Sequence, residues 1–508
     1  MISSVAPARR SAAALPVRRG PAPLPSRERL LLSLVCAHLC FLPWALGDMH
    51  EWSQFASLAC SSASMGVALF SWHTSLEPRT PRLSSQPIFW IGVALLAYVF
   101  IQAVNPAWSY KRDGSSWWLV GVKHVVWLPS GMDTPFSMAN PWRYLVIYSS
   151  AWMTACAISV GFTRGRTVRI FFIALACNAF LLALLGLLER CTGADEILWH
   201  WRPPAYYFVS TFIYKNHAGA YFNIMLGICL GLATLYQERG RRLLEKSSPS
   251  MLFAFFGVIV ALVIVFSYSR AATILMLCYL PVVSALFAVS HLGLVKRSEN
   301  AWRKILPVCA VTTGFCMLAL LVLPTGQAME QMEALVSGGR SDAPDFRRAA
   351  TRATLEMARS EPIFGWGAGS FRFEFPNFQR ANVSILKDTQ GNTLFWEHAH
   401  NDYAELLSEL GLAGMALISV GALGYALSLV RLRFWENRAA AVIVGGCLLT
   451  LVHSYGDFNF YNPAILVTWC ACLTAIRRLL ETDEPGRRLA ATDAGHRRNF
   501  AMAGQVQK

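Results

Sequence analysis

The chain has 508 residues, of which 55% are hydrophobic and only 15% are charged, and its mean hydropathy is +0.39. This balance excludes an ordinary soluble domain and is typical of a membrane protein with several spans. The formal net charge is +15. We expect this excess of Lys and Arg to orient the chain in the membrane and to contact anionic lipids, and we do not expect nucleic-acid binding.

Apolar runs of about 20 residues, the length that crosses the hydrocarbon core of a bilayer, recur along the chain. They lie at 30–46, 54–73, 88–104, 143–162, 168–188, 218–236, 251–269, 272–290, 305–323, 411–430, 439–456 and 463–480. The sequence therefore predicts an all-α polytopic membrane protein with about twelve transmembrane helices.

Lys and Arg concentrate in alternate connecting segments, at 1–29, 79–82, 164–169, 239–246, 296–304, 431–438 and 477–508. Because cytoplasmic loops collect basic residues, we expect both termini in the cytoplasm. A signal peptide ending near Gly47 is the alternative for the N-terminus, but the many later spans favour a retained helix.

The predicted organisation has five parts. They are a basic cytoplasmic segment 1–29, nine helices over 30–323, a large outer loop 324–410, three helices over 411–480 and a cytoplasmic tail 481–508. Two further outer loops, 105–142 and 189–217, are also too long for simple turns.

Ionisable residues at the edges of spans are costly and point to function. The stretch YKNHAGAYF places Lys215, Asn216 and His217 at an outer helix entrance, where a helix N-terminus favours anions. The stretch FSYSRAATI places Arg270 between two apolar runs on the outer side. Its guanidinium suits phosphate oxygens, although a side chain that reaches the interface for its own hydration is the alternative.

Two features stand out in the loop 324–410. DFRRAATRATLEMAR predicts a helix over 345–359 with Arg348 and Arg352 on one face, which is either a solvated face or an anion-binding one. The glycines of GWGAGSF, from Gly365 and Gly367 onward, predict a tight turn. The pattern lacks the strand-to-helix context of a nucleotide-binding loop.

The stretch HAHNDYAELLSELGLAG begins just before the next apolar run. We expect a helix over 399–411, capped by Asn401 or Asp402. Capping leaves His398 and His400 unexplained, and an imidazole accepts a proton near neutral pH, so His400 is a candidate general base.

Near the end of the chain, His453 and Asp457 are one turn apart in HSYGDFNFYNPA, and we expect them to pair and hold a helix end. The sequence has no DxD motif and no carboxylate cluster suited to a metal, so we expect neither a metal nor another cofactor.

Together these residues resemble the O-antigen ligase and polymerase superfamily of membrane glycosyltransferases. The most specific likeness is HNDYAELLSELGLAG, which carries the family pattern at His400, Asn401, Gly411 and Gly414. Three further matches support it: Ser269-Arg270, the run from Pro362 through Gly365 and Gly367 to Phe371, and His453 with Asp457-Phe458. The likeness covers roughly 205–475, while the first 200 residues match only in hydropathy.

The resemblance implies a glycosyltransferase-C-like fold in the bacterial inner membrane with an active site facing the periplasm. The donor would be a glycan on undecaprenyl pyrophosphate, His400 would deprotonate or orient the acceptor hydroxyl, and Arg270 would hold the pyrophosphate without a metal. Lys215, Arg348 and Arg352 are the contenders for a second basic group on the phosphates.

Other choices stay open at this stage. Asn216, His217 and Asn401 are expected to line the substrate site, and His398 either supports a neighbour or lines the entrance. The acceptor is lipid A core, a growing glycan or a protein, so a ligase, a repeat-unit polymerase and a protein O-oligosaccharyltransferase all fit. A transporter or flippase, or a non-catalytic assembly scaffold, is a more distant alternative.

Overall fold

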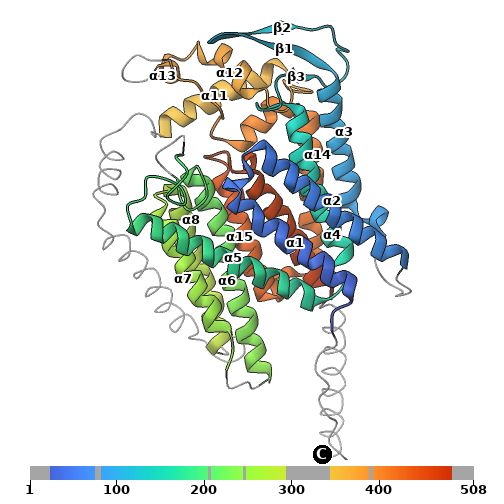
Figure 1. Cartoon of the computed structure of the whole chain (residues 1–508), viewed down its shortest axis with the longest axis vertical. Coiled ribbons are helices and arrows are strands. Elements are labelled where there is room, and N and C mark those ends of the chain that lie inside the picture. Colours follow the sequence, from blue (N-terminus) through green and yellow to red (C-terminus); the bar gives the residue numbers. More distant parts are fainter. Residues whose placement is uncertain are drawn as a thin grey trace, which may run out of the picture.

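A computed structural model describes residues 23–74, 82–203, 208–243, 247–292, 344–387 and 393–482, and within these ranges the chain is mostly helical (Figure 1). The longer helices are α1 (Ser26–Trp44), α2 (Glu51–Thr74), α3 (Pro87–Val104), α4 (Pro141–Gly161), α5 (Gly165–Cys191), α6 (Lys215–Leu243), α7 (Ser250–Phe266), α8 (Arg270–Leu292), α11 (Pro344–Ser360), α14 (Asp402–Arg431), α15 (Arg438–His453) and a C-terminal helix, Pro463–Thr482. Two shorter helices are α12 (Phe371–Gln379) and α13 (Val383–Leu386).

The predicted spans overlap helices wherever the chain is described, and the span at 305–323 lies outside the described residues. Within the described ranges, six helices are long and apolar enough to cross a membrane: Pro87–Val104, Pro141–Gly161, Gly165–Cys191, Lys215–Arg241, Asp402–Arg431 and Pro463–Thr482. Three further apolar helices, in α7, α8 and α15, have described lengths below that limit. The helical, multi-pass character is thus confirmed, and the number twelve stays a prediction.

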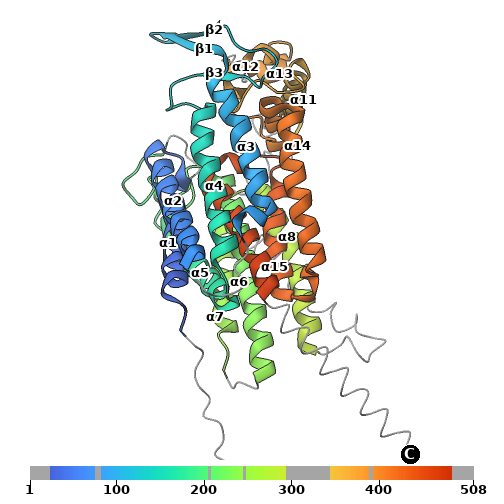
Figure 2. The same cartoon turned by 90° about the vertical axis from the view of Figure 1, so that its right-hand side faces the viewer.

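Helix α6 lies at the centre of the bundle, where it packs against α5, α7, α8 and α15 (Figures 1 and 2). A Cβ atom on Gly227 of α6 would lie only 2.8 Å from the Cα of Gly446 in α15. Small residues let two helix backbones approach this closely. Large apolar side chains of α6, among them Tyr221 and Phe222, are fully buried and form part of the main core.

One end of the bundle carries a cap made of a small sheet and of α11, α12 and α13 (Figures 1 and 2). The sheet has the order β2-β1-β3, where β1 (Pro106–Asp113) pairs antiparallel with β2 (Ser116–Gly121) and parallel with β3 (Gly131–Asp133). The all-α prediction is therefore wrong for the loop 105–142. Aromatic residues occur in both strands, at Trp108 and Tyr110 in β1 and at Trp117 and Trp118 in β2, and an Asp113-Gly114 pair marks the end of β1. These are signals of a hairpin that a pattern of long apolar runs does not contain.

The cap has an apolar core of its own. Its buried members come from α11, α12, α13 and the segment before α14: Ala350, Ala353, Met357, Phe371, Phe375, Ile385, Trp396 and Ala399. The rings of Tyr110 and Trp117 pack edge-on to Phe373 and so tie the sheet to α12. The helix predicted over 345–359 is confirmed as α11. Because Trp396 and Ala399 belong to this core, the segment that leads into α14 is held in place.

Candidate functional site

The glycine turn of the cap packs against the first part of α14. Gly365, Gly367 and Gly369 all have positive φ angles, of 69°, 101° and 80°. A Cβ atom on Gly365 would lie 2.5 Å from the carbonyl of Glu409, and the backbone N–H of Gly367 donates to that carbonyl at 2.9 Å. Gly411, with φ 61°, interrupts α14 at the same contact. The geometry is that of the tight turn expected for GWGAGSF.

Helix α14 begins at Asp402, three residues later than predicted. Asn401 is its N-cap, and the side-chain oxygen accepts from the N–H groups of Tyr403 and Ala404. His400 therefore lies outside the helix, in left-handed backbone with φ 51°. The N–H of Asp402 donates to the carbonyls of Ser454 and Asp457, which ties this helix start to the loop after α15. A non-glycine residue in this region of φ is uncommon and often marks a functional position.

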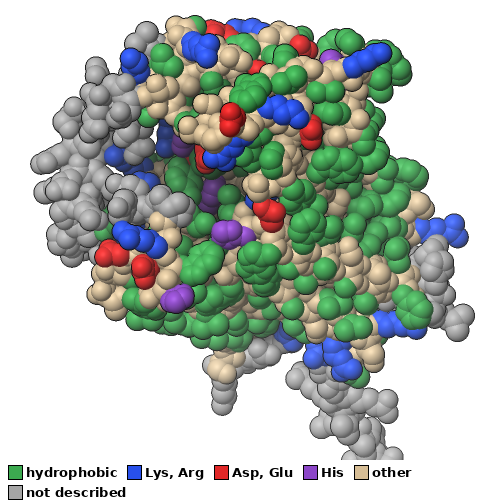
Figure 3. All heavy atoms as spheres, turned by 45° about the horizontal axis from the view of Figure 1, so that its top comes forward, with side chains coloured by type: hydrophobic (Ala, Val, Ile, Leu, Met, Phe, Trp, Pro, Cys, Tyr) green, Lys and Arg blue, Asp and Glu red, His purple; other side chains and the backbone are tan. Residues whose placement is uncertain are grey.

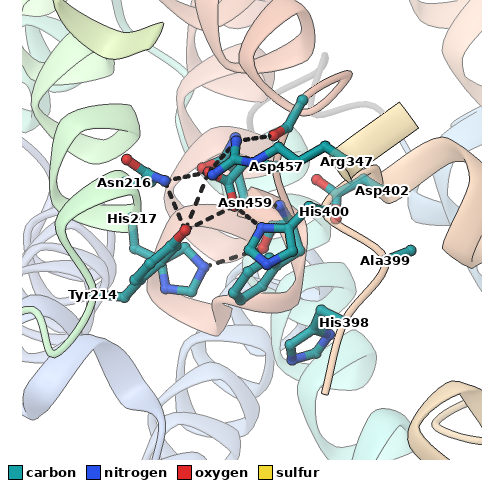
Figure 4. A network of polar contacts seen from close by, with 12 residues as sticks. Tyr214, Asn216, His217, Arg347, His398, Ala399, His400, Asp402, Asp457 and Asn459 are labelled. Atoms are coloured by element: carbon teal, nitrogen blue, oxygen red, sulfur yellow. Dashed lines mark hydrogen bonds and ion pairs between the residues drawn. The ribbon is translucent and has the colours of Figure 1, made fainter. Parts of the chain in front are cut away.

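Asp457 lies in that loop and is completely buried, yet polar groups from three other segments surround its carboxylate (Figure 4). Asn216 donates to Oδ2, and the Tyr214 hydroxyl lies 3.4 Å from both oxygens. His400 Nδ1 lies 3.5 Å from Oδ1, and the Arg347 guanidinium lies 3.8 Å from Oδ2. The start of α6, the start of α11 and the segment before α14 therefore converge on one carboxylate.

The charge of Asp457 follows from these neighbours. Burial alone raises its pKa, but the nearby imidazole of His400, together with His453 and the Arg347 guanidinium, outweighs burial and holds the pKa well below its usual range. Asp457 is thus an anion at neutral pH. A buried carboxylate this close to one ring nitrogen of a histidine favours a proton on that nitrogen, which leaves the other nitrogen to accept a proton.

The ring of Phe458, next to this carboxylate, is surrounded by other rings. It stacks on Tyr214 and on His398, with centroids 5.2 and 4.2 Å apart, and lies edge-on to His217 and His400. His217 Nε2 is also 3.1 Å from the Phe458 carbonyl. Three of the predicted histidines thus share one aromatic contact. His398 pairs in addition with Glu405, as its Nδ1 lies 2.7 Å from Oε1.

We call the groups around Asp457 and Phe458, namely Tyr214, Asn216, His217, His398 and His400, the cluster. The predicted basic residues lie at different places around it. Lys215 is half-buried at the first residue of α6, next to Asn216. Arg270 is half-buried at the first residue of α8, and that helix start packs on the first turns of α6. A Cβ atom on Gly219 would lie 3.2 Å from Ser269, and Asn223 donates to the Ala272 carbonyl.

Three of the arginines of helix α11, Arg347, Arg348 and Arg352, face different surroundings. Arg348 and Arg352 are exposed, while Arg347 turns toward the cluster and donates to the Gly456 carbonyl at 2.7 Å. Sequence analysis did not single out Arg347. Its position relative to the buried Ala350, Thr354 and Met357 follows the i, i+3, i+7, i+10 spacing of one helix face, which was the available signal.

The predicted hydrogen bond between His453 and Asp457 is absent. His453 is buried, and neither of its ring nitrogens has a hydrogen-bond partner within the described ranges. The Asp457 carboxylate accepts its hydrogen bonds from other groups, among them Asn216. Tyr214 and Glu405 were missed, and Phe458 was noted only as part of a motif. The contacts of Tyr214 with Asp457 and Phe458 join residues far apart in sequence, whereas Glu405 pairs with His398, seven residues away. Gly414 packs on Leu410 and Tyr98 instead of contacting the cluster.

A hollow opens at this end of the molecule, and His side chains and Lys or Arg side chains lie inside it (Figure 3). The side chains of His398, His400 and Arg347 are 20%, 26% and 28% exposed. Among the described residues, no group of three or more His, Cys, Asp or Glu could hold a metal ion. The hollow therefore combines proton-accepting rings with cations next to a helical bundle.

These features define a mostly helical, multi-pass membrane protein with a polar site at one end of its bundle. Residues 255–419 match the family model described as O-antigen ligase. The chain thus carries a domain of the O-antigen ligase superfamily. The matched residues include Arg270, the glycine turn and His400, while α6 and Asp457 lie outside them. No curated protein matches the chain.

Proposed function

We propose that the protein transfers a glycan from undecaprenyl pyrophosphate to an acceptor hydroxyl at the periplasmic face of the bacterial inner membrane. The observation that carries this proposal is the His400 ring, which has Nδ1 against the buried carboxylate of Asp457 and a partly exposed side chain. Such a pair is suited to taking a proton from a hydroxyl. The O-antigen ligase domain supplies the class of substrates, a lipid-linked glycan and an acceptor in a membrane.

In the proposed reaction, Nε2 of His400 accepts the proton of the acceptor hydroxyl. The oxygen of that hydroxyl attacks the anomeric carbon of the donor sugar. The bond between that carbon and the pyrophosphate oxygen breaks, and undecaprenyl pyrophosphate leaves with the electron pair. Asp457 stabilises the imidazolium that forms and keeps the ring oriented. The proton then passes from His400 to water or to the departing phosphate.

The leaving pyrophosphate gains negative charge, and we propose that cationic side chains of the protein neutralise it. Arg270 is the proposed primary contact, since a planar guanidinium binds phosphate oxygens in a bidentate way. Lys215, Arg348 and Arg352 remain proposed second contacts, with Asn216, His217 and Asn401 lining the site. Fixed cations aimed at developing charge are an effective form of electrostatic catalysis. We propose on this basis that transfer proceeds without a metal.

The same site chemistry serves two related activities, so a repeat-unit polymerase and a protein O-oligosaccharyltransferase remain alternatives. The proposal also includes the finer topology: twelve spans, both termini in the cytoplasm and the cap on the periplasmic side. A transporter is the more distant alternative. Such proteins often consist of two related halves, and the sequence shows no internal repeat of that kind.

The deciding experiment uses the purified full chain in lipid with an undecaprenyl-pyrophosphate oligosaccharide, alone and with lipid A core. The wild type is compared with His400→Ala and with His124→Ala, a control because His124, within the described part of the chain, bonds only its own segment through the Val122 carbonyl. A product that requires core indicates a ligase, and a ladder of longer lipid-linked chains indicates a polymerase. Absence of transfer to either glycan, or full activity in His400→Ala, would contradict the proposal.

A further inference from the structure

The proposed mechanism uses one histidine–carboxylate pair, but the site holds a second one. His398 Nδ1 lies 2.7 Å from Oε1 of Glu405, a fully buried residue in the first turn of α14. The other oxygen of Glu405 accepts the backbone N–H of Ala399 at 2.6 Å. One carboxylate therefore fixes both the ring of His398 and the backbone that leads to His400. Pairing through Nδ1 leaves Nε2 as the ring atom available to a ligand.

The two rings contact the same aromatic residue, Phe458. His398 stacks on Phe458 at 4.2 Å between centroids with an interplanar angle of 15°, while His400 meets Phe458 edge-on at 5.1 Å. Both side chains are partly exposed. Trp396 also packs edge-on to the His400 ring, with centroids 5.8 Å apart. A ligand that reaches His400 is thereby also close to His398.

The charge state of His398 restricts what it can recognise. Burial lowers its pKa to about 4, with Arg372 acting in the same direction against Glu397 and Asp457. The ring is therefore neutral at pH 7. A neutral imidazole offers little to a pyrophosphate, which prefers cations, but it forms a good hydrogen bond with a hydroxyl. A hydroxyl both donates and accepts, so this bond forms in either tautomer of the ring.

We propose that Nε2 of His398 hydrogen-bonds a second hydroxyl of the acceptor, while His400 takes the proton of the first. His398 is then a positioning residue, and the site selects a polyhydroxylated acceptor, which is a sugar, over the lone hydroxyl of a Ser or Thr side chain. The inference rests on the proposed function and sharpens it, because it disfavours a protein acceptor. A site built to bond a hydroxyl discriminates strongly against a partner that lacks it.

The test measures acceptor and donor dependence separately. A long lipid-linked glycan is the donor, and lipid A core or a lipid-linked single repeat unit is the acceptor. His398→Ala should raise the KM for the acceptor about tenfold to a hundredfold, the effect of one lost hydrogen bond. The KM for the donor should stay unchanged. His398→Gln, which keeps a hydrogen-bonding group, should recover part of the loss, and His124→Ala should behave as wild type.

The outcomes separate this inference from the proposed function. Wild-type transfer with an unchanged acceptor KM in His398→Ala would overturn the inference alone. So would equal effects of that variant on donor and acceptor, because a general structural defect acts on both. A Ser-containing peptide that accepts the glycan as well as the sugars do would also overturn it. No transfer by the wild type to any glycan would refute the proposed function and the inference with it.

Discussion

The carboxylate of Asp457 lies 3.5 Å from the ring of His400, although the two residues belong to different loops. The contact depends on backbone bonds, since the N–H of Asp402 donates to the carbonyls of Ser454 and Asp457. The start of α14 and the loop after α15 are therefore one unit. Any change that weakens this junction alters the orientation of the candidate base.

Asp457→Asn should keep the fold and reduce transfer about a hundredfold or more, the usual contribution of an oriented general base. The amide can donate to Nδ1 and thereby favour the wrong tautomer of His400. Transfer rates of purified wild type and variant under saturating donor check this. Asp113→Asn, in the exposed hairpin turn, is the control. Wild-type rates in Asp457→Asn would show that the pair has no catalytic role.

The sequence predicted the positions of the described helices well because crossing a membrane requires long apolar runs. It also drew attention to His398, His400, Asn216 and His217. It did not predict that these residues converge, because Asp457 joins segments that are distant in the chain. The wrong start of α14 has a local cause: Asn401 is a better N-cap than the residues before it, and it leaves His400 outside the helix.

Arg347 and Arg348 form a matched pair of neighbours on α11. Arg347→Ala should lower transfer at least about tenfold, because it removes a charge-assisted hydrogen bond to the Gly456 carbonyl and a cation near Asp457. Arg348 is exposed, so a strong effect of Arg348→Ala would require direct contact with the substrate. The measurement is the transfer rate of each purified variant under the same conditions, which shows which arginine contributes more. A larger loss in Arg348→Ala would make the outward face of α11 the phosphate contact.

Arg270→Lys tests the proposed bidentate contact with pyrophosphate. Lysine keeps the positive charge but replaces the planar fork with a single ammonium group, so we expect at least about a tenfold loss of transfer. Donor binding, measured by the KM for the lipid-linked glycan, should weaken as well. Arg239→Lys, at the opposite end of α6 from Lys215, is a suitable control. Retained turnover in Arg270→Lys would indicate an arginine that only contacts the membrane interface.

Gly365→Ala should destabilise the junction between the cap and α14. Its Cβ atom would lie 2.5 Å from the carbonyl of Glu409, in backbone with φ 69° that alanine adopts only with strain. Gly114→Ala is matched, with φ 56° but open space around the added atom, and should lose only about 1–2 kcal/mol of stability. The measurement is the melting temperature of each variant in detergent. Equal losses would mean that the close backbone contact contributes nothing.

Removal of divalent metal tests how the charge of the leaving pyrophosphate is neutralised. If Arg270 and its basic neighbours perform this task, a chelator such as EDTA should leave the rate of transfer unchanged. A metal would otherwise act as a Lewis acid on the phosphate oxygens, and its loss would raise the barrier by several kcal/mol. The measurement is the transfer rate before and after chelation, followed by addition of Mg²⁺. A loss of activity that Mg²⁺ restores would replace the arginine-based mechanism with a metal-assisted one.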